Sequence, residues 1–460
     1  MKDTGTRKQM MLYAPVEKVI PRLAVPTIIT MLITSIYNMA DTYFVSQINT
    51  SASGAVGVIF SAMSFIQAIA FTFGMGSGTN VSQALGAGDE DRAKQFASTG
   101  FFTAFATGIL IAVLGLTNID RLVVFLGATE TIAPYAKDYA TYIFYATPFI
   151  MCSFLMNNLL RFQGLAAYGM IGITSGGILN MILDPFFIFG LELGTAGAAI
   201  ATALSQFISF CILLFMTQTR KEAISIHPRN YRFDPKIHLK IWNNGLPSLA
   251  RQGIASIASI VLNNVAGPYG DAAIAALSIS NRFVLFINST VIGFGQGFQP
   301  LCGFCYGAKR YDRVKKAFWF CSKVATVILV ILSAVAFIFS EQIITLFRRD
   351  DLEVIRIGTL ALRLQLLTMP LWGFVTMSNM LSQSIGYGIR ASILASARQG
   401  LFLIPILLIL PEHLGLGLFG LQVARPLGDL FTLVLCIAII AGILKKLDRL
   451  ASSAEEPQHP

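Results

Sequence analysis

Apolar segments long enough to cross a bilayer alternate with short polar stretches along the whole chain. A helix needs roughly 20 mostly apolar residues to cross a hydrocarbon core of about 30 Å, because each residue rises about 1.5 Å. Twelve segments meet this requirement, over about 20–46, 54–84, 93–116, 134–160, 166–190, 194–217, 241–266, 271–302, 314–340, 353–383, 387–411 and 416–443. The pattern predicts an all-α integral membrane protein with twelve transmembrane helices.

One sequence pattern occurs twice, about 220 residues apart. Residues 74–94 read GMGSGTNVSQALGAGDEDRAK, residues 293–315 read GFGQGFQPLCGFCYGAKRYDRVK, and Pro26 corresponds to Pro247. The repeat predicts two six-helix lobes. We expect an N-terminal lobe over 1–217, a polar cytoplasmic linker over 218–240, and a C-terminal lobe with a short cytoplasmic tail over 241–460. Many secondary transporters are built from such repeats, with the binding cavity between the lobes.

Composition and charge support a membrane location. The chain is 55% hydrophobic and 13% charged, which is not typical of a soluble globular domain. Most of the 34 Lys and Arg residues fall on one side of the predicted bilayer: in the N-terminus, the 86–94 turn, Arg161, the linker, the 307–316 turn, Arg390 and the C-terminal tail. The other side carries Arg121, Lys137, Arg348, Arg349 and Arg356. Basic loops are typically cytoplasmic, so both termini are expected there. The net charge of +10 therefore requires no nucleic-acid partner.

The first half carries two acidic residues inside predicted helices, Asp41 and Asp184. Each lies five or six residues from the outer end of its segment, at about 1.5 Å per residue, so the two occupy similar depths and could face one another. Polar residues on the same helices and on the sixth segment reach a comparable level. The cluster predicted there comprises Asp41, Asp184, Tyr37, Asn38, Asn180 and Thr202.

Two neighbouring carboxylates in a low dielectric cannot both stay ionised cheaply. Either one holds a proton, or a cation binds between them, and either arrangement would form a coupling-ion site. Oxygen ligands from Asp, Asn and Thr suit Na⁺ as well as protons, so the sequence leaves both open. The alternative is that each Asp only bonds a neighbouring helix. We expect no other metal and no organic cofactor.

Several segments together resemble the multidrug and toxic compound extrusion family, and within it the bacterial branches with acidic residues in the N-terminal lobe. They are Pro26 with YNMADTYFVSQI at 37–48, the glycine-rich end of the second span with ALGAGDEDRAK, LLRFQG at 159–164 and GGILNMILDPFFIFG at 176–190. The resemblance implies export of amphiphilic, often cationic compounds from a bacterial plasma membrane, by antiport with H⁺ or Na⁺ and alternating access. It implies an ion site formed by Asp41, Asn180, Asp184 and Thr202, a cavity lined by Tyr37, Tyr139 and Asn157, and a bend of the first helix at Pro26.

The second half instead carries basic residues within its spans. Arg251, Arg282, Arg363 and Arg398 lie about ten residues into their helices, whereas Arg425 can pair with Asp429 one turn away. Mid-membrane arginines brace backbone carbonyls or bind an acidic group of a substrate. The second possibility places Arg282 and Arg398 in the cavity and predicts zwitterionic or anionic substrates as well.

The sequence thus predicts a secondary transporter, not an enzyme, with small amphiphilic substrates and surrounding lipid as its partners, acting as a monomer. No GxxxxGK[ST] motif is present, so transport is expected to use an ion gradient. The alternative function is a flippase for lipid-linked oligosaccharide or another lipid-like substrate, which the basic second half favours.

Overall fold

The computed structural model describes residues 2–220, 224–347 and 351–455, and these residues form helices joined by short loops. The elements are α1 (Lys2–Tyr13), α2 (Val16–Ser46), α3 (Thr50–Gly86), α4 (Glu90–Thr117), α5 (Ile119–Phe125), α6 (Ala133–Phe162), α7 (Ala166–Pro185), η1 (Phe186–Gly190), α8 (Gly194–Thr219), η2 (Pro228–Asn230), α9 (Pro235–Ala266), η3 (Gly267–Tyr269), α10 (Asp271–Gly307), α11 (Tyr311–Ile338), α12 (Ser340–Phe347), α13 (Leu352–Thr368), α14 (Leu371–Ser384), α15 (Gly388–Ser396), η4 (Ala397–Leu401), α16 (Leu403–Leu408), η5 (Ile409–His413) and α17 (Gly417–Glu455). The predicted all-α class is confirmed.

The number of spans also agrees with the sequence. Within the described ranges, eleven helices or helix runs are long and apolar enough to cross a membrane, and a twelfth span is formed by α13 and α14 together. The sequence predicts one continuous helix over 353–383, but the chain bends by 57° between Thr368 and Leu371. Pro370 occupies this break, where its ring and missing N–H disfavour a continuous helix.

Hydropathy did not predict several short elements. The polar α1 precedes the first span, and α5 and α12 follow the third and ninth spans. The fifth and eleventh spans each change from α-helix to π-helix, at η1 and at η4. Such local distortions are frequent at functional sites.

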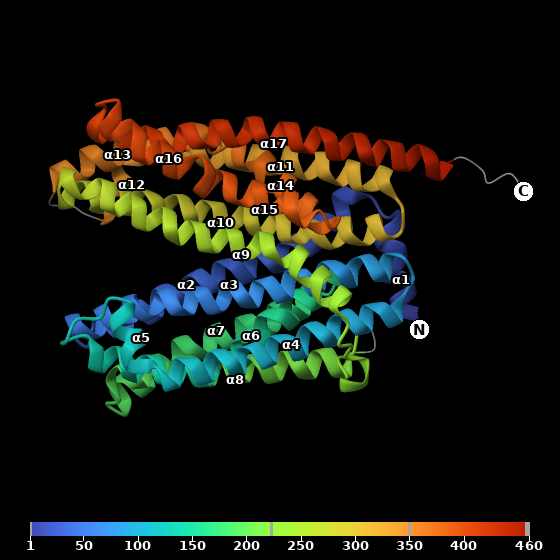
Figure 1. Cartoon of the computed structure of the whole chain (residues 1–460), viewed down its shortest axis with the longest axis horizontal. Coiled ribbons are helices and arrows are strands. Elements are labelled where there is room, and N and C mark those ends of the chain that lie inside the picture. Colours follow the sequence, from blue (N-terminus) through green and yellow to red (C-terminus); the bar gives the residue numbers. More distant parts are fainter. Residues whose placement is uncertain (1, 221–223, 348–350, 456–460) are drawn as a thin grey trace, which may run out of the picture.

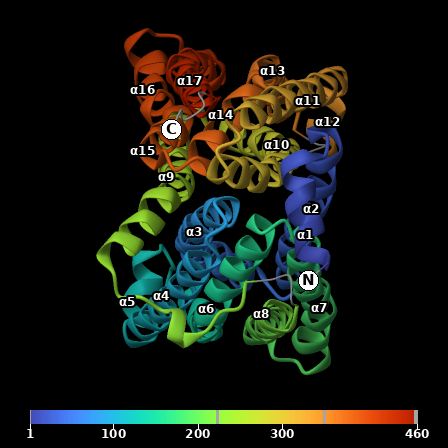
Figure 2. The same ribbon diagram turned by 90° about the vertical axis from the view of Figure 1, so that its right-hand side faces the viewer.

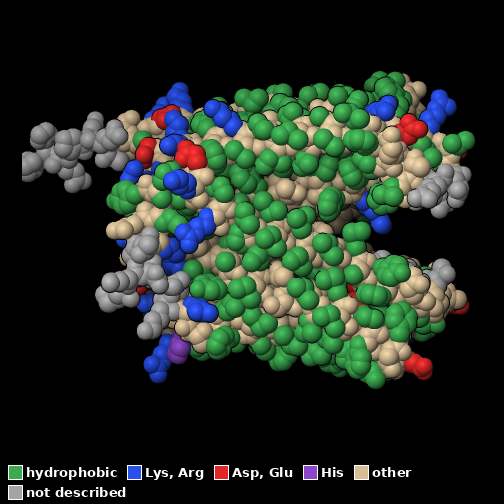
Figure 3. All heavy atoms as spheres, turned by 180° about the vertical axis from the view of Figure 1, so that it is seen from behind, with side chains coloured by type: hydrophobic (Ala, Val, Ile, Leu, Met, Phe, Trp, Pro, Cys, Tyr) green, Lys and Arg blue, Asp and Glu red, His purple; other side chains and the backbone are tan. Residues whose placement is uncertain are grey.

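The helices gather into two bundles, one containing α3–α8 and the other α10–α17 (Figure 2). Both chain termini lie at the same end of the molecule (Figure 1), which we call the termini end. The opposite end, where α5 and α12 lie, we call the open end. At the open end the surface is hollowed between the bundles, while hydrophobic side chains cover the flanks (Figure 3). A wide apolar flank between charged ends is the surface expected of a membrane protein.

Two helices cross between the bundles near the termini end. The first residues of α2, from Val16 to Ala24, pack in the core of the second bundle, while the later part of the helix runs along α7. In α9 the order is reversed, because Ile241 packs in the first core and Leu262 in a cluster of the second bundle. The predicted boundaries at 217 and 241 divide the chain in sequence order. In the structure, the start of the first repeat packs in the second bundle, and the start of the second repeat packs in the first bundle.

Glycines permit the close approach of the bundles. A Cβ on Gly86 of α3 would collide with the carbonyl oxygen of Phe304, and a Cβ on Gly307 of α10 would collide with that of Gln83. These are repeat-related residues, so α3 and α10 contact each other in a nearly symmetric way. Small residues at helix crossings are the usual means of close packing in membranes.

Arg161, counted from the sequence among the basic residues on one side of the bilayer, lies in the same interface in the last turn of α6. Its side chain is 1% exposed, and from α6 it donates hydrogen bonds to the Gln296 carbonyl (2.7 Å) and to Gln299 Oε1 (3.1 Å) of α10. A second guanidinium nitrogen donates to Asn158 Oδ1 at 2.6 Å. Removing a charge from water is unfavourable unless hydrogen bonds compensate for the lost hydration. Arg161 finds these partners on α10 only while the two bundles are in contact, so it stabilises the closed interface.

Candidate functional site

The first half of the candidate ion site lies between α2 and α6. Asp41 is in the later part of α2, and its Oδ2 accepts a hydrogen bond of 3.2 Å from the hydroxyl of Tyr139. Tyr139 is fully buried in the first turns of α6, because the helix turns that side chain toward the bundle interior. A hydrogen bond to an ionisable group fixes the carboxylate at a defined position.

The second half is supplied by α7 and α8. Asn180 lies one turn before Asp184, and its Nδ2 donates to Asp184 Oδ1 (3.0 Å) and to Thr202 Oγ1 (3.2 Å). All three side chains are 5% exposed or less. The helices that carry the two halves pack against one another, α2 on α7 and α6 on α8, so the two halves belong to one cluster. The sequence predicted that the first, fifth and sixth spans meet at this level, and the structure adds Tyr139 from α6 to the residues found there.

Three oxygen atoms of this site have no hydrogen-bond partner among the described residues. They are Asp41 Oδ1, Asp184 Oδ2 and Asn180 Oδ1, and each is shielded from solvent. Unpaired buried acceptors are costly, and a carboxylate or carbonyl oxygen is satisfied only by a donor or a cation. The chemistry of the site therefore fits a proton or a small hard cation.

A site for a transition metal is not indicated. No group of three or more His, Cys, Asp or Glu side chains that could hold a metal ion occurs within the described ranges. All six cysteines are free, and Cys302 and Cys305 are buried within α10. The carboxylate, amide and hydroxyl oxygens of this site suit hard cations, the class to which Na⁺ belongs.

The other predicted residues of the first bundle lie at different levels. Tyr37 is buried with its ring against Gly177 of α7, and Asn38 is half-buried one turn before Asp41. Asn157 packs against Gly169, and it lies 18 residues beyond Tyr139 on α6, or about 27 Å along the helix. The structure therefore brings Tyr37 near the acids and leaves Asn157 close to the termini end.

Pro26 lies where α2 passes from one bundle to the other. Before it, Ala24 packs against Gly297 of α10, and after it, Thr27 Oγ1 donates to the Gly293 carbonyl at 2.7 Å. Proline removes one backbone hydrogen bond inside the helix and so provides a point of bending. The residues that follow carry Asp41.

The second bundle corrects one expectation about its arginines. Arg398 has an acidic partner, since its Nε lies 3.1 Å from Asp429 Oδ1, and its guanidinium stacks over the ring of Trp372. Asp429 also accepts a hydrogen bond of 2.9 Å from Thr368 Oγ1. The sequence predicted that Arg425 can pair with Asp429, and Arg425 does line the same small pocket as Asp429, but the short ion pair is made by Arg398 of η4.

The other three mid-membrane arginines of the second bundle make no salt bridge within the described ranges. Arg282 is exposed on α10, and Arg363 donates to Ser340 Oγ at 2.7 Å. Arg251 of α9 is half-buried. These residues give the second bundle a basic character that the first bundle lacks.

Comparison with known proteins gives a consistent result. The family model described as MatE matches residues 26–186 and 247–409, once in each half of the chain. The multidrug export protein MepA of Staphylococcus haemolyticus (strain JCSC1435) is 28% identical over 87% of this chain and 88% of its own length. MepA of Staphylococcus aureus (strain NCTC 8325 / PS 47) is 26% identical over 90% and 92%.

Solved structures agree over nearly the whole length. A MOP superfamily transporter from Pyrococcus furiosus Vc1 superposes with a TM-score of 0.90 at 26% identity, covering 95% of this chain and 98% of that one. A MATE structure described as being in the bent conformation gives 0.91, again at 26% identity, over 97% and 99%. Since the family model covers more than half of the chain and matches it once per repeat, the chain belongs to the MatE family of secondary transporters.

Proposed function

We propose that this transporter exports amphiphilic, often cationic small molecules by antiport with H⁺ or Na⁺, through alternating access of the cavity between the two bundles. The names of the staphylococcal relatives support export of multiple drugs. The hollow at the open end (Figure 3) and the likeness to a structure described as outward-facing support a cavity that opens on one side.

The observation that carries the coupling proposal is the set of three unpaired acceptor oxygens on Asp41, Asn180 and Asp184. An incoming ion satisfies these atoms and removes the repulsion between the two carboxylates. A substrate cation leaves the cavity as the ion binds, because the negative charge that attracted it has been neutralised. Antiport follows from this competition.

The two helix segments around Pro26 offer a route from ion binding to movement. The segment before Pro26 is anchored on α10, while the segment after it carries Asp41 beside α7. A change in the interaction of Asp41 with the first bundle therefore alters the bend of α2 across the cavity. In this proposal Pro26 is the hinge, Tyr37, Asn38 and Tyr139 line the cavity beside the ion site, and Asn157 lines its termini end.

The proposed orientation places the termini end in the cytoplasm of a bacterial cell. Basic residues gather at that end, and cytoplasmic loops carry the positive excess. The open end then faces outward, where drug leaves and the ion enters. The proposal requires no organic cofactor, no nucleic acid and no second subunit, and its partners are the small substrate and membrane lipid.

Efflux of ethidium from energised cells tests this function. Wild type, Asp41→Asn and Asp184→Asn are compared under separately imposed proton and Na⁺ gradients, with Asp120→Asn, an exposed residue at the open end, as the matched control. Efflux that depends on one gradient, persists in the control and disappears in both site variants supports the exporter and identifies its ion. Wild-type efflux that continues in both site variants would exclude this site as the coupling site.

A second function, flipping of a lipid-linked oligosaccharide or another lipid-like anion, is favoured by one specific observation. Arg251 and Arg282 carry positive charge in the second bundle and make no salt bridge in the described ranges. In that case no gradient would drive ethidium efflux, and neutralising Arg282 would abolish translocation of the anionic lipid. Transport of a simple lipophilic cation that is unaffected by Arg282→Gln or Arg398→Gln argues against a role for these residues in substrate binding.

A further inference from the structure

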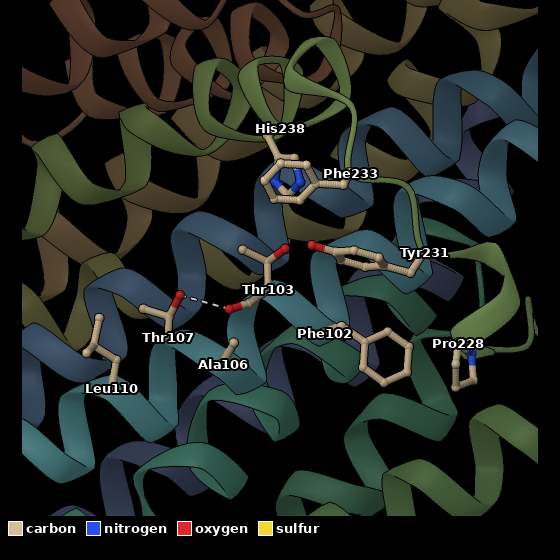
Figure 4. A pocket seen from close by; sticks show the side chains of 9 residues that line it. All are labelled: Phe102, Thr103, Ala106, Thr107, Leu110, Pro228, Tyr231, Phe233 and His238. Atoms are coloured by element: carbon tan, nitrogen blue, oxygen red, sulfur yellow. Dashed lines mark hydrogen bonds between the residues drawn. The ribbon is translucent and has the colours of Figure 1, made fainter.

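A groove outside the ion site lies between α4 and the segment that joins the two bundles. It has a volume of about 620 Å³, within the range of roughly 300–1,000 Å³ typical of sites for small organic ligands. Side chains from α4 form one wall, and the linker and the first turns of α9 form the other (Figure 4). Its lining is Phe102, Thr103, Ala106, Thr107, Leu110, Pro228, Tyr231, Phe233 and His238.

The linker is fixed against α4 at the end of this groove near Ser98 and Thr99, which we call its upper end. The end near Leu110 is its lower end. The backbone N–H of His227 donates to Ser98 Oγ (3.1 Å), and that of Arg232 donates to Thr99 Oγ1 (3.2 Å). Asp234 Oδ1 accepts from the Lys236 N–H and starts α9. These bonds hold residues 227–236 in a defined position, so the groove is part of the folded structure.

The groove runs from the level of the linker toward the middle of the apolar flank. From Ser98 to Leu110, α4 rises about 18 Å, close to half of a hydrocarbon core of about 30 Å. Leu110 and Val113 are 57% and 51% exposed on the outer face of this helix, where the surroundings are lipid. The lower end of the groove therefore opens to acyl chains.

The upper end has the side chains of a membrane interface. Tyr231 and Phe233 lie there, and Trp242 follows His238 by one turn on α9. Aromatic rings of this kind concentrate at the boundary between lipid and water. Residues 224–240 contain Arg229, Arg232, Lys236 and Lys240 against the single acid Asp234. All four basic side chains are exposed, and Asp234 is occupied in capping α9.

Two polar atoms inside the groove have no partner among the described residues, Thr103 Oγ1 and His238 Nε2. The Nε2 of His238 is shielded from solvent, while its ring lies against Tyr231 and Phe233 at centroid distances of 6.4 and 5.9 Å. A buried ring nitrogen is expected to find a hydrogen-bond partner. Figure 4 shows this ring above Thr103, facing the space between the two walls.

We infer that the groove between α4 and the linker binds an anionic phospholipid. One acyl chain lies along α4 from Thr103 to Leu110, and the phosphate lies against Arg232 and Lys236. His238 contacts the polar part of the lipid just below the phosphate. Because the linker connects the two bundles and α9 crosses between them, a bound lipid stabilises the position of the linker during transport.

Fluorescence of Trp242 provides a direct test, because this residue lies one turn beyond His238 on α9. Full-length protein with Trp319→Phe and Trp372→Phe is placed in nanodiscs containing phosphatidylcholine and brominated phosphatidylglycerol, or the reverse labelling. We expect phosphatidylglycerol to associate near Trp242 about fivefold or more strongly than phosphatidylcholine, since each basic residue near a surface favours anionic lipid by about fivefold. Both leaflets have the same composition, so the result does not depend on the proposed orientation.

Two variants separate the parts of this site. Arg232→Gln with Lys236→Gln should lower the association ratio several-fold, whereas the matched control Lys445→Gln with Arg449→Gln, exposed on α17 at the same end, should leave it unchanged. Ala106→Phe, which fills the groove without changing charge, should also lower the ratio several-fold. A ratio near one in the reporter protein, or a ratio undiminished in either groove variant, overturns the inference.

A second measurement uses the unsubstituted chain in case the reporter protein does not fold. Phosphatidylglycerol added to detergent-solubilised protein should raise its thermal unfolding midpoint more than phosphatidylcholine does, and Ala106→Phe should remove this difference. An equal effect of the two lipids on the wild type, or a difference that survives Ala106→Phe, contradicts a specific site.

Discussion

Tyr139 and Asn180 do the positioning in the ion site, and they leave acceptor atoms of the acids unpaired. Tyr139 holds Asp41 through one oxygen, and Asn180 holds Asp184 through one oxygen while also bonding Thr202. Each carboxylate thus keeps one oxygen for an ion. One hydrogen bond fixes the position of each carboxylate, and the second oxygen of each carboxylate remains available to bind an ion.

Tyr139→Phe tests this positioning role. Loss of the bond to Asp41, worth about 1.5–3 kcal/mol for a charged acceptor, should lower the transport rate at limiting ion concentration by about tenfold or more. Tyr145→Phe, 61% exposed on the same helix, serves as the control and should transport like wild type. Equal rates in the two variants, measured as initial ethidium efflux, would show that Asp41 needs no such support.

The sequence predicted which residues form the ion site, but it did not predict the partners of the buried arginines elsewhere in the chain. Depth counting and the spacing of Asn180 and Asp184 placed the first, fifth and sixth spans at one level, because helix geometry is regular, whereas Tyr139 on α6 came only from the family resemblance. The sequence could not predict that Arg161 is buried, because its hydrogen-bond partners lie on α10 in the other bundle. Its apolar neighbours in the segment LLRF were the one available signal. Nor could it choose Arg398 over Arg425 as the partner of Asp429, since that choice depends on how η4 packs on α17.

Two helices, α2 and α9, differ from the others because each packs against the cores of both bundles. Pro26 in α2 and Pro247 in α9 are repeat-related, and each lies where its helix leaves one bundle core for the other. A proline at this point removes one backbone hydrogen bond, so the helix can bend between its two packed segments while each segment keeps its contacts. The repeat identified the two prolines, but only the packing shows why they occur there.

Pro26→Ala is therefore expected to slow transport several-fold while leaving the protein folded. Alanine restores the backbone N–H and stiffens the helix, so the segment carrying Asp41 moves less readily. Pro21→Ala, in the same helix but exposed and inside the anchored segment, is the matched control and should have little effect. The comparison is made by initial efflux rate and by thermal unfolding of the purified proteins. Similar rates for the two variants would exclude a hinge at Pro26.

For the whole molecule, the closed interface at the termini end and the hollow at the open end are the two features that alternating access requires. Gly86 and Gly307 let α3 and α10 touch, and Arg161 bonds across the same interface. To open toward the termini end, the bundles would have to separate these contacts. The repeat predicted two similar bundles, but side-chain packing, not periodicity, determines which face is closed.

Gly86→Ala tests the closed interface. Its new methyl group would meet backbone at Phe304, which cannot move without separating α3 from α10, so we expect a lower unfolding temperature and lower transport. Gly57→Ala on the same helix has open space around the added carbon and should be neutral or slightly stabilising. Reporter fluorophores on the two bundles at the termini end should also move apart in Gly86→Ala alone. An unchanged separation and unfolding temperature would mean that the interface tolerates the added group.

Countertransport in proteoliposomes tests the central claim most directly. An imposed gradient of ethidium, with no ion gradient, should drive H⁺ or Na⁺ in the opposite direction through the wild-type protein, and Asp184→Asn should abolish that ion flux while the protein stays folded. Ethidium movement without any counterflow of H⁺ or Na⁺ in the wild type, or an undiminished ion flux in Asp184→Asn, would contradict coupling at the site formed by Asp41, Asn180, Asp184 and Thr202.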